Sequence, residues 1–246
     1  MSAAVFSIPL WADLVAVGVG SLQGAMFASG FRDRRLDLLG IAIIGVATGV
    51  GGGLLRDLLL VVRPVALQSN WYLLTTVVAA LLGMLLIRLF RRLDPIITFL
   101  DALTIGLFGA IGATKALALG LPEVPALFVG VVSAVGGSIL RDVLLNLPIA
   151  LMHVGSLYAV AAGAGAAVLI VLVDLHVPIP VAAIACVAVT LVIRLLAVRF
   201  GWSLPEQREL GRIPRPRWPR IARRSVEERT DTGAIPRYKI ERGDGQ

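Results

Sequence analysis

Two arginine–aspartate pairs inside long apolar runs are the residues of this sequence best suited to chemistry. Arg56-Asp57 and Arg141-Asp142 each interrupt an apolar run that is long enough to cross a membrane. A charge at the centre of a membrane span costs at least about 2.5–3.5 kcal/mol, so it needs a partner or a water-filled cavity. An arginine beside a carboxylate meets that need. The two pairs therefore predict a charged inner framework around an ion or substrate pathway.

Small residues precede both pairs. They are Gly51, Gly52 and Gly53 in the first run and Gly136, Gly137 and Ser138 in the second. Successive glycines allow a helix to kink or unwind locally, and carbonyls freed in this way are good ligands for a monovalent cation. Thr48 and Ser133 lie nearby and could add hydroxyl ligands or bond back to their own helices. The pattern predicts a pore or ion site, with close helix packing as the alternative.

The two motifs belong to an internal repeat. GVATGVGGGLLRDLLL (Gly45–Leu60) returns 85 residues later as GVVSAVGGSILRDVLL (Gly130–Leu145), with ten of 16 positions identical. Asp13 and Asp101 correspond in the same way near the starts of earlier apolar runs. Each copy contains three predicted spans, so the second copy enters the membrane from the opposite side. Such an inverted repeat predicts a site near the bilayer midplane.

The composition indicates an all-α integral membrane protein. Of 246 residues, 57% are hydrophobic and only 16% are charged, against about 25% charged in soluble domains. This excludes a soluble enzyme, a disordered chain, a disulfide scaffold and a nucleic-acid-binding domain. Spans of about 20 apolar residues are needed to cross the hydrocarbon core. The seven candidates are Leu10–Gly30, Leu36–Val62, Trp71–Leu89, Pro95–Leu119, Pro125–Leu147, Gly155–Val173 and Ile179–Val198.

These spans predict four parts of the chain. They are a first three-helix repeat (1–94), a second three-helix repeat (95–178), a seventh helix (179–200) and a basic tail without packed structure (201–246). Arginines cluster in the loops after the first and third spans and in the tail. Because basic residues favour the cytoplasmic side, we expect an outside N-terminus and a cytoplasmic C-terminus in a bacterial cell membrane. The tail is also suited to anionic lipid, or serves only as a topology anchor.

The paired GGGLLRD and GGSILRD motifs, in two three-helix repeats followed by a seventh helix, resemble the trimeric intracellular cation (TRIC) channel family. Its bacterial members also carry a glycine transporter domain label. The resemblance covers about Asp13 to Val198. It implies a homotrimer with one pathway per protomer, second and fifth helices kinked at the glycines, and permeation of monovalent cations, K⁺ foremost. Ser138 departs from a third glycine, which could alter selectivity or serve the same end.

Three functions remain open at this point. The first is a K⁺ (or Na⁺) channel, and the second is a secondary transporter of a small zwitterion such as glycine, bound through arginine and aspartate. The third is a structural or regulatory membrane protein without a permeant. We expect no enzyme, cofactor or metal site, because no nucleophile–base pair or metal-ligand set is evident. Asp13 and Asp101 suit helix N-termini or a cation-attracting vestibule, and Lys115 suits either snorkelling to the interface or gating.

Overall fold

The computed structural model describes residues 8–30, 36–89, 94–152 and 157–202, and within them it contains helices and no strand. The elements are α1 (Leu10–Gly30), α2 (Leu38–Leu59), η1 (Val65–Leu67), α3 (Asn70–Leu89), α4 (Asp94–Ala118), α5 (Glu123–Leu144), η2 (Ala150–Met152), α6 (Tyr158–Asp174) and α7 (Ile179–Phe200). Six of the helices are long and apolar enough to cross a membrane, and α6 is a shorter apolar helix of 17 residues. The predicted all-α membrane fold with seven helices is confirmed.

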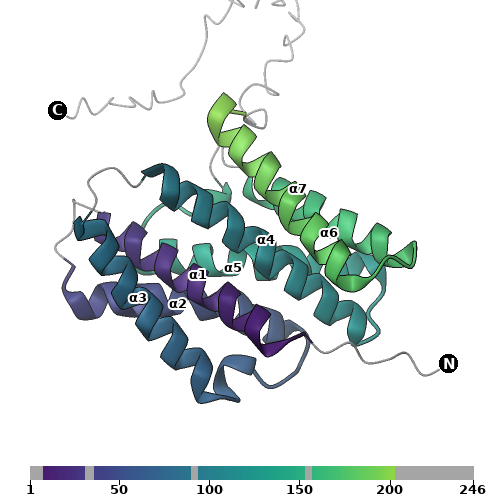
Figure 1. The fold of residues 1–246 in the computed structure, drawn as a ribbon, viewed down its shortest axis with the longest axis horizontal. Coiled ribbons are helices and arrows are strands. Elements are labelled where there is room, and N and C mark those ends of the chain that lie inside the picture. Colours follow the sequence, from purple (N-terminus) through teal and green to yellow (C-terminus); the bar gives the residue numbers. More distant parts are fainter. Residues whose placement is uncertain (1–7, 31–35, 90–93, 153–156, 203–246) are drawn as a thin grey trace, which may run out of the picture. The chain divides into compact units, whose positions relative to one another are not determined.

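The first three helices pack against one another, and so do α4, α5 and α6 (Figure 1). The two groups meet where α2 packs on α5 and where α1 packs on α4. The seventh helix, α7, packs against α4 and α6 and so lies on the second group. The contacts thus form two groups of three helices, with α7 on the second group. The basic tail from residue 203 onward and the arginine loop at 32–35 lie outside the described residues.

The helices α2 and α5 end earlier than their apolar runs predict. The run Leu36–Val62 predicts a longer span, but α2 stops at Leu59 and the chain turns through Val61, whose φ is 54°. In the same way α5 stops at Leu144, and Asn146 has a φ of 49°. Both arginine–aspartate pairs therefore lie in or next to the last turn of their helices. The prediction that these charges sit at the middle of a span is wrong.

Glycines bring α2 and α5 into close contact. A Cβ at Gly52 would overlap the carbonyl oxygen of Ser133, and a Cβ at Gly137 would overlap that of Thr48. As α2 advances from Thr48 to Gly52, its contact on α5 moves back from Gly137 to Ser133. The two helices are therefore antiparallel where they cross. Because α2 and α5 each continue past this crossing to their own arginine–aspartate pair, the pairs lie on opposite sides of it.

Both helices continue through their glycines. The α-helix of α2 runs without interruption from Leu38 to Leu59, and that of α5 runs from Glu123 to Leu144. The unwound turn that the glycines allow is therefore absent from these two helices, whose carbonyls remain inside the helical ladder, and a kink at the glycines stays a prediction. The energetic loss of placing glycine in a helix, about 1 kcal/mol relative to alanine, is offset here by the close approach of two backbones.

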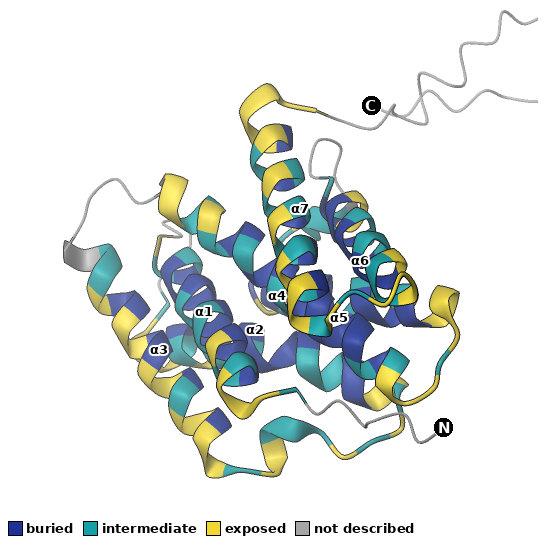
Figure 2. Cartoon of the chain, turned by 45° about the vertical axis from the view of Figure 1, so that its right-hand side comes forward, coloured by how far each residue is buried: buried dark blue, intermediate teal, exposed yellow. Residues whose placement is uncertain are grey.

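Large apolar side chains cover the outer faces of the helices. Figure 2 shows exposed residues along α3 and α7, in contrast with the buried residues of α2 and α5. Trp71, Leu74 and Leu85 of α3 and Ile184 of α7 are each exposed by more than half of their surface. Apolar faces of this kind are suited to contact with lipid. The backbone N–H and C=O groups beneath them are already hydrogen-bonded within the helices, as a membrane requires.

The crossing gives a test of packing. Gly52→Ala should lower the apparent melting temperature of the detergent-purified protein, because the added methyl group meets the backbone of Ser133. Overpacking of this kind costs about 1–3 kcal/mol. Gly53→Ala is the matched control, since a Cβ there would lie 3.8 Å from Arg56 and 4.0 Å from Phe108. Equal melting temperatures for the two variants would contradict the packing role of Gly52.

Candidate functional site

The first charged cluster surrounds Asp57 at the end of α2. Arg56 Nε lies 2.7 Å from Asp57 Oδ1, and its Nη2 lies 3.2 Å from Oδ2. Lys115, in the last turn of α4, places Nζ 2.8 Å from Oδ1. The backbone N–H of Val65, which opens η1, donates to Oδ2 at 2.8 Å. One buried carboxylate thus joins the ends of α2 and α4 to the turn that leads into α3.

Asp13 extends this cluster to α1 and α3. Its Oδ1 lies 3.6 Å from Arg56 Nη1, and its Oδ2 accepts a hydrogen bond of 2.9 Å from the hydroxyl of Tyr72. Asp13 lies in the first turn of α1, where the helix dipole favours a carboxylate. Arg56 therefore bridges two carboxylates from two helices. Asp13 and Arg56 are both buried, with 6% and 2% of their surface exposed.

The second cluster repeats the first around Asp142 at the end of α5. Arg141 places Nε 3.0 Å and Nη2 2.8 Å from Asp142 Oδ1. The backbone N–H of Ala150, which opens η2, donates to Oδ2 at 2.9 Å. Ala150 follows Val65 by the same 85 residues that separate the two aspartates. The same local arrangement therefore ends both central helices.

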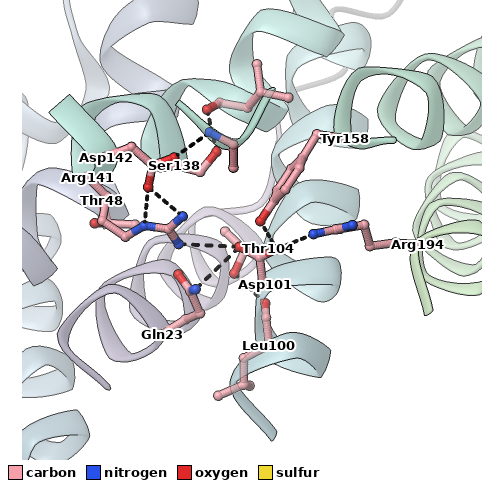
Figure 3. Close-up of polar contacts among 12 residues, drawn as sticks. Gln23, Thr48, Leu100, Asp101, Thr104, Ser138, Arg141, Asp142, Tyr158 and Arg194 are labelled. Carbon is pink, nitrogen blue, oxygen red and sulfur yellow. Dashed lines mark hydrogen bonds and ion pairs between the residues drawn. The ribbon is translucent and has the colours of Figure 1, made fainter. Parts of the chain in front are cut away.

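Asp101 of α4 takes the place that Asp13 has in the first cluster. Figure 3 shows four side chains from different helices converging on its carboxylate. Arg141 Nη1 lies 3.5 Å from Oδ1, and Gln23 Nε2 of α1 donates to Oδ1 at 3.3 Å. The hydroxyl of Tyr158 donates to Oδ2 at 2.5 Å, and Arg194 Nη2 of α7 lies 3.7 Å from Oδ2.

The predicted hydroxyls have different surroundings. Thr48 Oγ1 donates to the carbonyl of Ile44 at 2.7 Å, and Ser138 Oγ donates to that of Val135 at 2.8 Å. Both hydroxyls are thus bonded within their own helices. Ser133 Oγ is buried and has no hydrogen-bond partner among the residues that the structure describes. It is the hydroxyl of the three that remains available to a ligand.

The sequence therefore identified the core of both clusters but missed several partners. Both arginine–aspartate pairs, Asp13, Asp101 and Lys115 lie in the clusters, whereas the glycines lie at the crossing between them. Arg194 and Gln23 were missed. A charged residue inside the apolar run of the seventh helix was the signal for Arg194. Tyr72 and Tyr158 were recognisable as equivalent positions of the repeat, but without any role.

Comparisons with known proteins fit this duplicated architecture. The family model described as Glycine transporter matches residues 10–88 and 98–174, which contain α1–α3 and α4–α6. The UPF0126 inner membrane protein YadS of Escherichia coli K12 is 34% identical over 199 residues, which cover 79% of this chain and 94% of YadS.

Two solved structures have the same fold. The TRIC trimeric intracellular cation channel orthologue from Rhodobacter sphaeroides matches with a TM-score of 0.72 and 28% identity, covering 78% of this chain and 98% of that one. A second TRIC cation channel structure matches with a TM-score of 0.69 and 31% identity, over 80% and 96% of the two chains.

The fold and the paired clusters define an integral membrane protein of bacterial type. The chain belongs to the family described by the Glycine transporter model, which is the bacterial branch of the TRIC channel family. This confirms the resemblance drawn from the GGGLLRD and GGSILRD motifs. The family consists of channels and UPF0126 membrane proteins rather than enzymes.

Asp57→Asn tests the electrostatic role of the first cluster. Either amide orientation would point an N–H₂ group at donors that the carboxylate now accepts from, which are Arg56, Lys115 and Val65. Breaking a buried charge pair costs about 3–5 kcal/mol, so the apparent melting temperature should fall clearly. Asp37→Asn is the matched control, since Asp37 is an exposed N-cap of α2 and asparagine caps equally well. Equal effects would contradict the role of Asp57.

Proposed function

We propose that this chain is a monovalent cation channel, selective for K⁺, with one pathway through each protomer of a homotrimer. The observation that carries the proposal is the pair of equivalent charged clusters on opposite sides of the α2–α5 crossing. Its chemical interpretation draws on the similarity to solved TRIC cation channels, one of which is named as trimeric. In this interpretation the two halves form an inverted repeat, and each cluster faces one side of the membrane.

The pathway in this proposal runs from one cluster to the other past the small residues of the crossing. These residues are Gly51, Gly52, Gly53, Gly136, Gly137, Ser138, Thr48 and Ser133. The unpartnered hydroxyl of Ser133 supports this course, because it offers an oxygen to a cation that has lost water. In this proposal Asp13 and Asp101 are vestibule carboxylates, one on either side, and each is paired with an arginine of its cluster.

Lys115 is the gate of the first cluster in this proposal. Its ammonium lies 2.8 Å from Asp57, and about a fifth of its side chain is exposed. A lysine has a flexible stem and a compact charge, so it can leave the carboxylate without rearranging a helix. While it is bound to Asp57 it repels an arriving cation.

The proposed setting of the channel follows the charge pattern. We place the N-terminus outside and the basic tail on the cytoplasmic side of the cell membrane, where the tail can bind anionic lipid. The arginine–aspartate pairs take no part in binding the ion directly. They neutralise each other inside the protein and hold the walls of the pathway.

The second candidate is a secondary transporter of a small zwitterion such as glycine. The description of the family model favours it, and each cluster contains both a guanidinium and a carboxylate. Those groups already bond to each other and to a tyrosine. A bound zwitterion would have to replace these contacts, which makes this the weaker candidate.

Flux through liposomes that contain the purified protein distinguishes the two. We expect K⁺-driven changes in membrane potential, and no saturable uptake of radiolabelled glycine by the same preparation. Empty liposomes set the background for both signals. Saturable glycine uptake that depends on an ion gradient, with little passive K⁺ flux, would overturn the channel in favour of the transporter.

Lys115→Gln should raise the K⁺ flux, because the substitution removes a positive charge beside Asp57 while keeping a group that can donate a hydrogen bond. The increase should be severalfold at low salt and smaller at high salt, where screening is strong. Lys115→Arg keeps the charge and is the control. A flux equal to that of the wild type at all salt concentrations would contradict a gating role for Lys115.

A further inference from the structure

The sequence repeat does not supply all the charges of the two clusters. In the ion pairs between described residues each cluster has two carboxylates and two cations, but the second cation comes from a different part of the chain in each. In the first cluster, the carboxylates of Asp13 and Asp57 face the cations of Arg56 and Lys115. All four residues belong to the two repeats. Among the described residues joined by these ion pairs, positive and negative charges are therefore equal in number.

In the second cluster the carboxylates are Asp101 and Asp142, and one cation is Arg141. The other cation is Arg194, which comes from α7 and so from outside the repeats. Figure 3 shows its guanidinium directed at the Asp101 carboxylate from the side of α7.

The position that corresponds to Lys115 in the first repeat is Phe27, 88 residues earlier. The ring of Phe27 lies against Arg141, whose Cζ is 4.1 Å from the ring centroid. Phe27 thus occupies the expected place beside the second arginine–aspartate pair, but it brings no charge. Without a further cation the second cluster would have one more negative than positive charge.

We infer that Arg194 is the counterpart of Lys115 in the second cluster, a counter-ion from α7 that balances its carboxylates and so sets the field a cation meets on that side of the protein. Contacts with two residues place its guanidinium. It lies 3.7 Å from Asp101 and is stacked 3.9 Å from the ring centroid of Tyr158. The tyrosine hydroxyl bonds to the same carboxylate, so Arg194 and Tyr158 fix Asp101 together.

The two counter-ions have different freedom to move. Lys115 has one-fifth of its side chain exposed, whereas the side chain of Arg194 is 8% exposed. A stacked guanidinium is held more firmly than a lysine ammonium. Arg194 therefore acts as a positioning residue with a fixed charge, while Lys115 can release its carboxylate. The part of the inference that concerns the field on a permeating cation rests on the proposed channel function.

The charge balance of the second cluster can be tested by melting temperatures, without measuring ion flux. Arg194→Gln and Phe27→Lys should each lower the apparent melting temperature, since the first leaves an excess negative charge and the second an excess positive charge. Combined, they should restore most of the loss, because the lysine introduced in place of Phe27 would stand beside Asp142 as Lys115 stands beside Asp57. Residues coupled in this way deviate from additivity. Losses that simply add would overturn the counter-ion role, and would indicate that Arg194 only packs against Tyr158.

The effect on the field can be tested by current recordings from patches of bacterial spheroplasts, in which the protein has a single orientation. Lys115→Gln and Arg194→Gln leave excess negative charge on opposite sides, so they should shift the rectification ratio in opposite senses. We expect shifts of about twofold or more at 0.01 M salt, where the Debye length is ~30 Å, and little shift at 1 M, where it is ~3 Å. Arg194→Gln/Phe27→Lys should return the ratio towards that of the wild type.

Two control variants fix the interpretation of these currents. Arg199→Gln removes a charge from an exposed position of the same helix, and Arg194→Lys keeps the charge of the cluster. The inference would be overturned if Lys115→Gln and Arg194→Gln shifted the rectification ratio in the same sense. It would also be overturned if the ratio of Arg194→Gln equalled that of Arg199→Gln. A wild type without K⁺ current would instead overturn the proposed channel, and the melting temperatures would still decide the role of Arg194.

Discussion

The burial of two carboxylates at the ends of the central helices governs the architecture of this protein. Asp57 and Asp142 are 1% and 2% exposed, and an ionised carboxylate removed from water loses several kcal/mol of solvation unless partners replace it. Each receives an arginine from the preceding residue and a backbone N–H from a 3-10 turn eight residues later. The carboxylate thus ties the end of its helix to the turn through which the chain runs back.

The glycine crossing and the charged clusters are two parts of one arrangement. At the crossing, Gly52 and Gly137 let the backbones of α2 and α5 approach until no side chain fits between them. Because the helices are antiparallel, each arginine is carried away from the crossing towards a different end of the bundle. There it meets a carboxylate from a helix of its own triplet, Asp13 of α1 or Asp101 of α4. Close contact at the centre therefore leaves the charges near the two ends.

Hydropathy and the repeat predict the seven helices and both arginine–aspartate pairs, but not the features that depend on packing. The apolar run continues after α2 has stopped at Leu59. The helix ends in a backbone turn, with Val61 at a positive φ and the Val62 N–H bonded to the Asp57 carbonyl, and hydropathy contains no information about that turn. Lys115 contacts Asp57 across 58 residues only because the packing of the two helix groups brings the end of α4 to the end of α2. Arg194 has no equivalent in either repeat, so comparing the two copies could not reveal it. The glycines alone could not decide between an unwound turn and a close crossing, since a run of small residues permits both equally.

A duplicated fold inserted in opposite directions would present the same surroundings to an ion from either side. Among the charged residues of the two clusters, this chain departs from that symmetry where Lys115 and Phe27 correspond. The helix outside the repeat supplies a charge on the side where Phe27 has none. Membranes have two different sides, with different ion concentrations and a potential between them. In the channel proposed here, a balanced but unequal pair of clusters is therefore better matched to that setting than two identical ones, and our inference gives α7 a role beyond covering the bundle.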